Sequence, residues 1–429
     1  SAPVQVPVEL EVVDWTLPEA RNFATFMGIY QSPESVALQY DVELWSEEHW
    51  KRMERSFELM GRLGNNLLIV PLVNRTEYGN DECMVTWVKG EKEGAYTYDF
   101  SVFDRYLEVA ARHCRLEVIS CQVVFGGGWF ASDPAKRPVS VTVVDPKTGK
   151  REPLVLPAHG SEEAKRLWKP LIDALIARLK RKGLEKTLTF GIGHCGGIHK
   201  DVRAQFKELA PGAGWHLGKH PRPRRGQHSY ADYVEYLYVG AIPPPEKERH
   251  HGWKRGDQLI IMCQRIYDAG QSTVTMRTMA ERALLLGDNG SGRICLDYWP
   301  VKGSSRHGGR ESLYDRWPTA RANQRCPHLS YLAAPGLEGA TSTIRLEALV
   351  EGLQEAEARV FLERAIDGKE LPDELAARAQ KLLDARVTFC RMTHGGGTAA
   401  DRAVYGSGWR ADSAALYRLA AEASAAISK

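Results

Sequence analysis

The sequence predicts an α/β fold, a somewhat irregular (β/α)8 or TIM-like barrel with a C-terminal helical extension. Eight strand-like apolar runs lie between residues 23 and 301, and helical patterns separate most of them. This alternation is typical of a parallel sheet that closes into a barrel. No Gly-x-Gly-x-x-Gly turn follows the first run, which disfavours a doubly wound open sheet. The chain of 429 residues, 43% of them hydrophobic, is large enough for such a domain.

The first half of the barrel has the clearest pattern. Strands are expected at 23–30, 65–73, 116–125 and 186–193, and helices at 46–64, 99–114, 161–183 and 199–210. The helix at 46–64 has Ser46 as its N-cap, acidic residues in its first turn and Gly64 as its stop. Pro170 predicts a kink in the third helix. A long polar loop is expected between the second strand and the helix at 99.

The second half is less regular. Strands are expected at 214–220, 234–242, 258–265 and 291–301, with a helix at 273–287 but no clear helix between the fifth and sixth strands. After residue 301 the sequence becomes polar and then predicts a long amphipathic helix at 341–366 and two more helical stretches. We therefore expect a strand-like lead-in at 1–22, the end of a preceding β-sandwich, a barrel at 23–301, and a loop and helical extension at 302–429 packed on the barrel.

Composition excludes several classes of partner. The formal net charge is +3, from 57 basic and 54 acidic residues, which gives no drive toward nucleic acid. No apolar run reaches the roughly 18 residues that span a bilayer. The 8 cysteines form no Cys-x-x-Cys or Cys/His pattern that would indicate structural zinc. We expect no nucleic-acid partner, no membrane span, no cofactor and no metal.

Candidate site residues follow from position, because active sites of these barrels lie where strands end. Carboxylates in this position are Asp81, Glu82 and Asp297. Asp297 lies among Cys, Leu, Tyr and Trp, where desolvation would raise its pKa and make it a general acid. The alternative is a structural aspartate that ties the last strand to a neighbouring loop through an arginine.

Other polar and aromatic residues at the strand ends are candidate substrate contacts. They are Tyr30, Asn74, Arg75, Trp129, His194, His199, His220, Gln264 and Trp299. Trp129 follows three glycines and suits stacking on a sugar ring, although it could also pack under its loop. The histidines could transfer protons, contact ligand or bind a metal. The basic run at 219–225 would favour an anionic sugar, unless it is only a solvated surface.

Several stretches resemble a known family. They are "ELWSEEHWKRMERSFELMGRLGNNLLIVPLV", "GAYTYDFSVFDRYLEVAARH", "FKELAPGAGWHLGKH" and "LSYLAAPGLEGATSTIRLEALVEGLQEAEARVFLE". The first three resemble the barrel of family 123 glycoside hydrolases. The fourth, with Ser342, Arg345, Glu347 and Gly352, resembles a C-terminal domain often found with that barrel.

The resemblance implies a (β/α)8 barrel, usually preceded by a β-sandwich, in an extracellular or periplasmic protein that acts on carbohydrate. Family members that have been characterised resemble β-N-acetylgalactosaminidases and use an adjacent Asp–Glu pair after the fourth strand. In that mechanism the substrate's acetamido group is the nucleophile, the Asp orients it and the Glu is the general acid. This sequence has His194 and Cys195 in that region, so that mechanism does not carry over to these positions.

We therefore predict a glycoside hydrolase-like protein that acts on a polysaccharide or glycan at the barrel mouth. Its acids are expected to be relocated from the usual pair to Asp297, Asp81 and Glu82. One alternative is a non-catalytic carbohydrate-binding barrel. The other is a histidine-based lyase or metal-dependent enzyme that uses His194, His199 and His220.

Overall fold

The structure, a computed structural model, describes most of the chain. The described residues are 5, 7–76, 78–124, 138–195, 198–219, 222–223, 227–236, 242, 251–263, 273–299, 332–392 and 408–428, without the side chains of residues 192–195 and 392.

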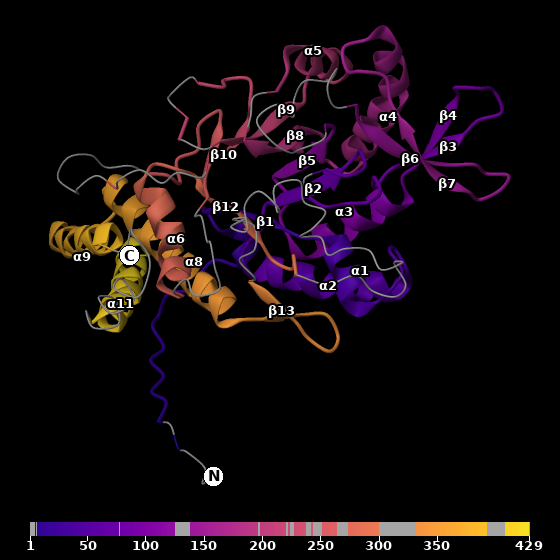
Figure 1. Cartoon of the computed structure of the whole chain (residues 1–429). Helices are drawn as coiled ribbons and strands as arrows, with labels where there is room; N and C mark the ends of the chain where they lie inside the picture. The colour runs from indigo at the N-terminus through magenta and orange to yellow at the C-terminus, as the bar shows by residue number, and fades with distance from the viewer. Residues whose placement is uncertain are drawn as a thin grey trace.

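Eight parallel strands form the central sheet, which is nearly closed (Figure 1). In chain order they are β1 (Phe26–Tyr30), β2 (Leu67–Pro71), β5 (Val118–Gln122), β8 (Leu188–Cys195), β9 (Gly214–Lys219), β10 (Tyr233–Tyr236), β11 (Leu259–Met262) and β12 (Gly290–Cys295). Their order around the sheet is β1-β12-β11-β10-β9-β8-β5-β2. Each coincides with one of the eight expected runs, so the predicted barrel is confirmed. The seventh and eighth strands are shorter than expected.

The barrel closes between its first two strands through asparagine side chains. β1 and β2 share a single bridge, from Met27 to Asn65. The Asn65 and Asn66 side-chain oxygens accept hydrogen bonds from the backbone N–H groups of Ile29 (2.8 Å) and Met27 (3.0 Å). Side-chain amides thus satisfy backbone donors of β1 that a continuous ladder would otherwise satisfy.

Helices cover the outside of the barrel. They are α1 (Pro33–Tyr40), α2 (Glu47–Arg62), α3 (Ser101–His113), α4 (Glu162–Arg181), α5 (Lys200–Leu209) and α6 (Thr273–Leu285). As expected, Ser46 caps α2, with its side chain accepting a hydrogen bond from His49 N. Pro170 lies inside the continuous helix α4. Helix α1 was not predicted from the sequence.

The core has two layers because alternate strand residues point to opposite faces of the sheet. The smaller cluster inside the barrel contains Phe26, Leu67, Val118 and Ile261. The larger cluster contains the neighbouring residues of the same strands, packed against the helices. This two-sided burial is why the strands are continuous apolar runs in the sequence.

A second, four-stranded sheet corrects the expectation of a long polar loop after the second strand. It consists of β3 (Thr86–Lys89), β4 (Tyr96–Asp99), β6 (Ser140–Val144) and β7 (Arg151–Val155), in the order β4-β3-β6-β7. It projects from the barrel beside α4 (Figure 1). Trp87 anchors it, in edge-on contact with Tyr96, Tyr98 and Trp168 of α4.

The C-terminal part contains a short hairpin and three helices on one side of the barrel (Figure 1). These elements are β13 (Ala333–Pro335), β14 (Ala340–Ser342), α8 (Ile344–Asp367), α9 (Asp373–Met392) and α11 (Trp409–Ile427). The carboxylate of Glu357 on α8 accepts hydrogen bonds from the backbone N–H groups of Ala24 and Thr25, both at 2.9 Å. This contact ties α8 to the chain just before β1.

The N-terminal segment runs away from the barrel past these helices (Figure 1). Val8, Leu10 and Val12 are exposed. Trp15 packs against Phe361 and Tyr417 of the C-terminal helices. Across the described residues, no helix has the length and apolar character needed to cross a bilayer.

Candidate active site at the barrel mouth

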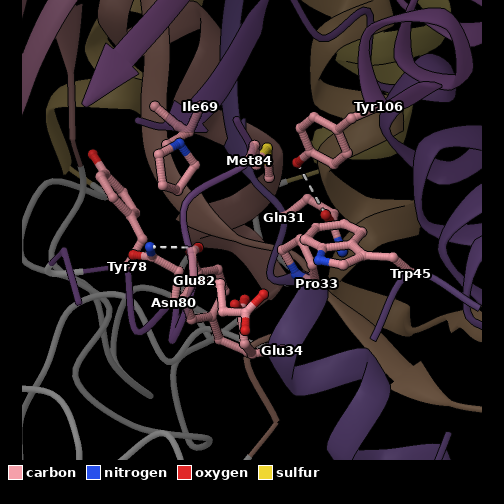
Figure 2. A pocket seen from close by; sticks show the side chains of 12 residues that line it. Gln31, Pro33, Glu34, Trp45, Ile69, Tyr78, Asn80, Glu82, Met84 and Tyr106 are labelled. Atoms are coloured by element: carbon pink, nitrogen blue, oxygen red, sulfur yellow. Dashed lines mark hydrogen bonds between the residues drawn. The ribbon is translucent and has the colours of Figure 1, made fainter. Parts of the chain in front are cut away.

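A pocket lies at the carboxyl ends of β1 and β2 (Figure 2). Its lining comes from the β1–α1 connection, from β2 and the loop after it, from α3 and from the end of β12. The lining residues are Gln31, Pro33, Glu34, Trp45, Ile69, Pro71, Tyr78, Asn80, Glu82, Met84, Tyr106 and Tyr298. This is the end of the barrel at which active sites are found.

Glu34 is placed in the pocket by the very short connection from β1 to α1. Ser32 caps α1, with its Oγ accepting a hydrogen bond from Ser35 N at 3.1 Å, and Pro33 starts the helix. The first helical turn therefore carries Glu34 into the mouth, where the helix N-terminus favours negative charge. Glu34 is 3% exposed, and its Oε1 accepts a hydrogen bond from the backbone N–H of Asp81 at 3.2 Å.

Glu82 brings a second carboxylate into the same pocket. Its Oε1 accepts a hydrogen bond from Arg151 Nε of β7 at 3.2 Å, and its side chain is 32% exposed. The backbone bond from Asp81 to Glu34 holds the Glu82 segment against α1. Two carboxylates from distant segments thus line one pocket.

The pocket also has an aromatic lining. Trp45, Tyr78, Tyr106 and Tyr298 contribute rings from four different segments. Tyr78 packs edge-on against Tyr30, with ring centroids 5.2 Å apart. Aromatic faces with a few polar groups between them are the usual lining of a sugar site.

Asn74 and Arg75 have different environments. Asn74 is buried, and its Oδ1 accepts hydrogen bonds from Cys83 N (2.8 Å) and Thr142 Oγ1 (3.0 Å). It therefore holds the loop that carries Glu82 against the small sheet. Arg75 is exposed and has φ of 54°, and its backbone N–H donates to Asn80 O.

Asp297 is fully buried behind the pocket. Its Oδ1 accepts a hydrogen bond from Ser32 N (2.8 Å), and its Oδ2 accepts from Ser56 Oγ (2.7 Å) and Gln31 Nε2 (3.0 Å). Burial raises the pKa of Asp297 to about 6, although these hydrogen bonds oppose the rise. Asp297 ties the end of β12 to α1 and α2, and it does so through serine and glutamine groups in place of the arginine considered from the sequence.

Trp299 and Tyr30 are also buried. The indole Nε1–H of Trp299 donates to Ala333 O at 2.9 Å, which joins the end of β12 to the C-terminal hairpin. The hydroxyl of Tyr30 donates to Glu235 inside the barrel. Neither residue lines the pocket.

Glu235 is the centre of a polar cluster inside the barrel. Tyr233 donates to its Oε1 at 2.7 Å, and His216 Nε2 lies 3.3 Å from its Oε2. Burial acts to raise the pKa of Glu235, but His216, Arg293 and Tyr30 outweigh it, and the pKa is lowered. A buried carboxylate is therefore stabilised by surrounding charge and hydrogen bonds.

Glycine 191 makes room for this polar interior. A Cβ there would lie 2.2 Å from Gln122 Nε2 and 2.5 Å from Ser120 Oγ. Ser120 Oγ lies 2.8 Å from His216 Nδ1, and Gln122 donates to Ser120 Oγ at 2.8 Å. The glycine in the fourth strand thus has a packing reason.

Some predicted contacts cannot be placed. Trp129, His220 and Gln264 lie outside the described residues, and His194 is described only as backbone at the end of β8. His199 caps α5, with its Nδ1 accepting a hydrogen bond from Asp201 N at 3.4 Å. Within the described part of the chain, no group of three His, Cys, Asp or Glu side chains is arranged to hold a metal ion.

The sequence reasoning missed Glu34, Tyr106 and Glu235. Glu34 has a local signal, because the tripeptide Ser32–Pro33–Glu34 directly after a strand indicates a helix N-terminus with an acidic first turn. Tyr106 and Glu235 have no comparable signal. Their positions depend on how helix α3 and strand β10 face the rest of the barrel.

Comparison with known proteins agrees with this architecture. The sequence profile of the glycoside hydrolase 123 catalytic domain matches residues 30–212. Over these residues the barrel is similar to family 123 glycoside hydrolases. The matched range runs from the last residue of β1 to just beyond α5 and includes the Glu34 and Glu82 segments. The likeness of residues 329–363 to the associated C-terminal domain lies beyond that range and stays a prediction.

A solved structure also resembles this family 123-related barrel. It is a family 123 glycoside hydrolase from Clostridium perfringens, studied for glycolipid glycan hydrolysis. The two share 15% sequence identity with a TM-score of 0.59, and the match covers 86% of this chain. It covers 64% of the Clostridium protein, so this chain spans less than two thirds of that relative. No curated protein sequence matches this chain significantly.

Proposed function

We propose that the barrel hydrolyses a glycosidic bond of a glycan or polysaccharide bound in the pocket at β1 and β2. The observation that carries this proposal is the lining itself, which combines aromatic rings with the carboxylates of Glu34 and Glu82. Glycosidases work with two carboxyl groups that flank the bond, one to protonate the leaving oxygen and one to act on the sugar or on water.

In this proposal Glu34 is the proton donor and Glu82 is the second carboxylate. Glu34 is nearly buried, and burial disfavours the charged form of a carboxyl group. Glu82 is more exposed, with 32% of its side chain accessible, and it forms an ion pair with Arg151. Asp81 fastens the Glu34 carboxylate through its backbone. Asp297, which is 0% exposed, supports the pocket wall without touching substrate.

The substrate class is part of the proposal. The Clostridium relative was studied for glycolipid glycan hydrolysis, so glycolipid glycans are the first substrates to try. An anionic sugar is a second option, although Arg222 of the basic segment is paired with Asp288 at 2.9 Å. The proposal keeps the extracellular or periplasmic location inferred from the resemblance.

The test is hydrolysis of a panel of aryl glycosides, glycolipid glycans, and neutral and anionic polysaccharides. Wild type is compared with Glu34→Gln, Glu82→Gln and the control Glu152→Gln, an acid of β7 paired with Lys89 at the protein surface. We expect kcat to fall by about 10²- to 10⁴-fold in the first two variants, the usual contribution of a general acid or base. The control should keep wild-type kcat.

Two results would overturn the proposal. Hydrolysis that survives both Glu34→Gln and Glu82→Gln would place the acids elsewhere at the mouth. Sugar binding by wild type without hydrolysis of any panel member would establish a non-catalytic carbohydrate-binding barrel instead.

A further inference from the structure

A chain of hydrogen bonds connects buried Asp297 with the pocket wall. Gln31 Nε2 donates to Asp297 Oδ2 at 3.0 Å. The hydroxyl of Tyr106 donates to the other end of the same amide, Gln31 Oε1, at 3.0 Å (Figure 2). Gln31 and Tyr106 both line the pocket, whereas Asp297 lies behind it.

The direction of this chain is fixed at Asp297. An ionised carboxylate can only accept hydrogen bonds, and its Oδ1 and Oδ2 also accept from Ser32 N and Ser56 Oγ. If the Gln31 amide were flipped, its oxygen would face Oδ2 with no hydrogen between the two acceptors. Gln31 must therefore present its oxygen to Tyr106.

Tyr106 then has no hydrogen left for the pocket. A phenol has one O–H donor and can also accept, and the contact with Gln31 Oε1 uses the donor because an amide oxygen has no hydrogen. Burial, followed by the charges of Asp297 and Glu34, raises the pKa of Tyr106 well above its ordinary value, so the phenol keeps its proton. Toward any further partner, the Tyr106 oxygen can therefore act only as an acceptor.

We propose that Asp297 is a positioning residue that sets the hydrogen-bond polarity of the pocket through Gln31 and Tyr106. The wall offers an acceptor at Tyr106, and the ligand it fits carries a donor there, a sugar hydroxyl or an amide N–H. Only the identity of the ligand as a sugar rests on the proposed function. The orientation of Gln31 and Tyr106 does not.

Asp297→Asn should reverse this polarity. The oxygen of the introduced amide stays on Ser32 N, a fixed backbone donor, and its NH2 group replaces Oδ2 beside Ser56 and Gln31. Two NH2 groups would then face each other, which forces Gln31 to flip and to present Nε2 to Tyr106. Tyr106 must accept that hydrogen bond, and its own O–H turns into the pocket.

Nuclear magnetic resonance on deuterated protein with labelled Gln and Tyr tests the orientation directly. Cross-relaxation from the Gln31 amide hydrogens to the Tyr106 ring hydrogens should be weak in wild type and strong in Asp297→Asn. Gln31→Met identifies the Gln31 signals. Ser56→Ala, which removes one hydrogen bond to Oδ2 without introducing a donor, should keep the wild-type pattern.

The wild-type spectrum alone can overturn the inference, even if Asp297→Asn fails to fold. Strong cross-relaxation between Gln31 amide hydrogens and Tyr106 in wild type would mean that the amide has the opposite orientation. Identical spectra of wild type and Asp297→Asn, or the same flip in Ser56→Ala, would also refute the role of Asp297.

A binding experiment adds a functional readout. Dissociation constants are measured for methyl β-galactopyranoside and its monodeoxyfluoro analogues, in which fluorine replaces a donor hydroxyl. In wild type one analogue should lose about tenfold in affinity, because its hydroxyl donates to Tyr106, and Asp297→Asn should lose that discrimination. Equal loss in both proteins contradicts the inference. Absence of sugar binding counts against the proposed function and leaves the spectroscopic test intact.

Discussion

Replacing Glu281 with glutamine should selectively loosen the C-terminal helices. Glu281 of α6 is 1% exposed and lies at the centre of a buried ion cluster with α8 and α9. It accepts hydrogen bonds from Arg386 (2.9 and 2.7 Å) and Arg359 (3.0 Å). Burial acts to raise the pKa of Glu281, but the two arginines outweigh it and lower the pKa, so the group is a carboxylate.

The expected loss is large because the arginines stay buried. In Glu281→Gln the cluster loses one negative charge and one of two acceptor oxygens, while Arg386 keeps its hydrogen bond to Glu355 and Arg359 keeps its pair with Glu363. Removing one partner of a buried ion pair costs about 3–5 kcal/mol. The exposed pair Glu422–Arg378 provides the control, and Glu422→Gln should cost about 0–1 kcal/mol.

Hydrogen exchange read by mass spectrometry measures the effect locally. A loss of 3–5 kcal/mol corresponds to a drop of about 10²- to 10³-fold or more in protection of α8 and α9 amides. A double-mutant cycle with Arg386→Met isolates the coupling between the two side chains. Protection in Glu281→Gln that matches Glu422→Gln would refute the idea that this cluster holds the helices on α6.

Three further predictions concern buried polar groups. In the folded protein the pKa of Asp297 is about 6, above the ordinary value of 3.8. The protonated carboxyl group therefore stabilises the fold, and this contribution to the unfolding free energy is lost as the pH rises from 3.8 through 6. Between pH 4 and 7 the unfolding free energy of wild type should fall by about 3 kcal/mol relative to Asp297→Asn, and parallel urea titrations would contradict this. Burial lowers the pKa of His159 to about 4 from 6.5, so stability is lost as pH falls between these values. Over that range the unfolding free energy of wild type should fall by about 3 kcal/mol more than that of His159→Phe. Equal losses in the two proteins would exclude His159 as the cause. Glu357→Ala should cost about 2–4 kcal/mol, since two backbone donors lose their acceptor, and exchange at Thr25 should rise less in Glu357→Gln, which keeps one oxygen.

The barrel could be predicted because its strands are buried on both faces. The run at 65–73 and the run at 116–125 are mostly apolar, and each ends in polar or glycine-rich sequence. The small sheet gave no such signal. In β4 and β7 half-buried residues alternate with exposed ones over only four or five positions, and the strands are stabilised mainly by packing around Trp87.

The site was only partly predictable for a different reason. Because Glu82 follows a strand, the sequence predicted that it lies at the barrel mouth. The apolar neighbours of Asp297 predicted that its carboxylate is desolvated. The sequence could not show that Asp297 faces Ser56 and Gln31, because that requires α2 and the β1–α1 connection to meet behind the pocket. Side-chain direction in a helix, which brings Glu34 into the pocket, depends on where the helix begins.

The contact of Glu357 with Ala24 and Thr25 has a consequence for biosynthesis. The groups it joins are 332 and 333 residues apart, so this contact can form only after all the strands of the barrel have been translated. β1 is synthesised long before its partner β12 and the carboxylate of α8. Contacts of such long range slow folding and leave strand edges uncovered in the meantime. A nascent chain truncated before β12 would thus leave one edge of β1 unpaired, a natural target for chaperones and proteases.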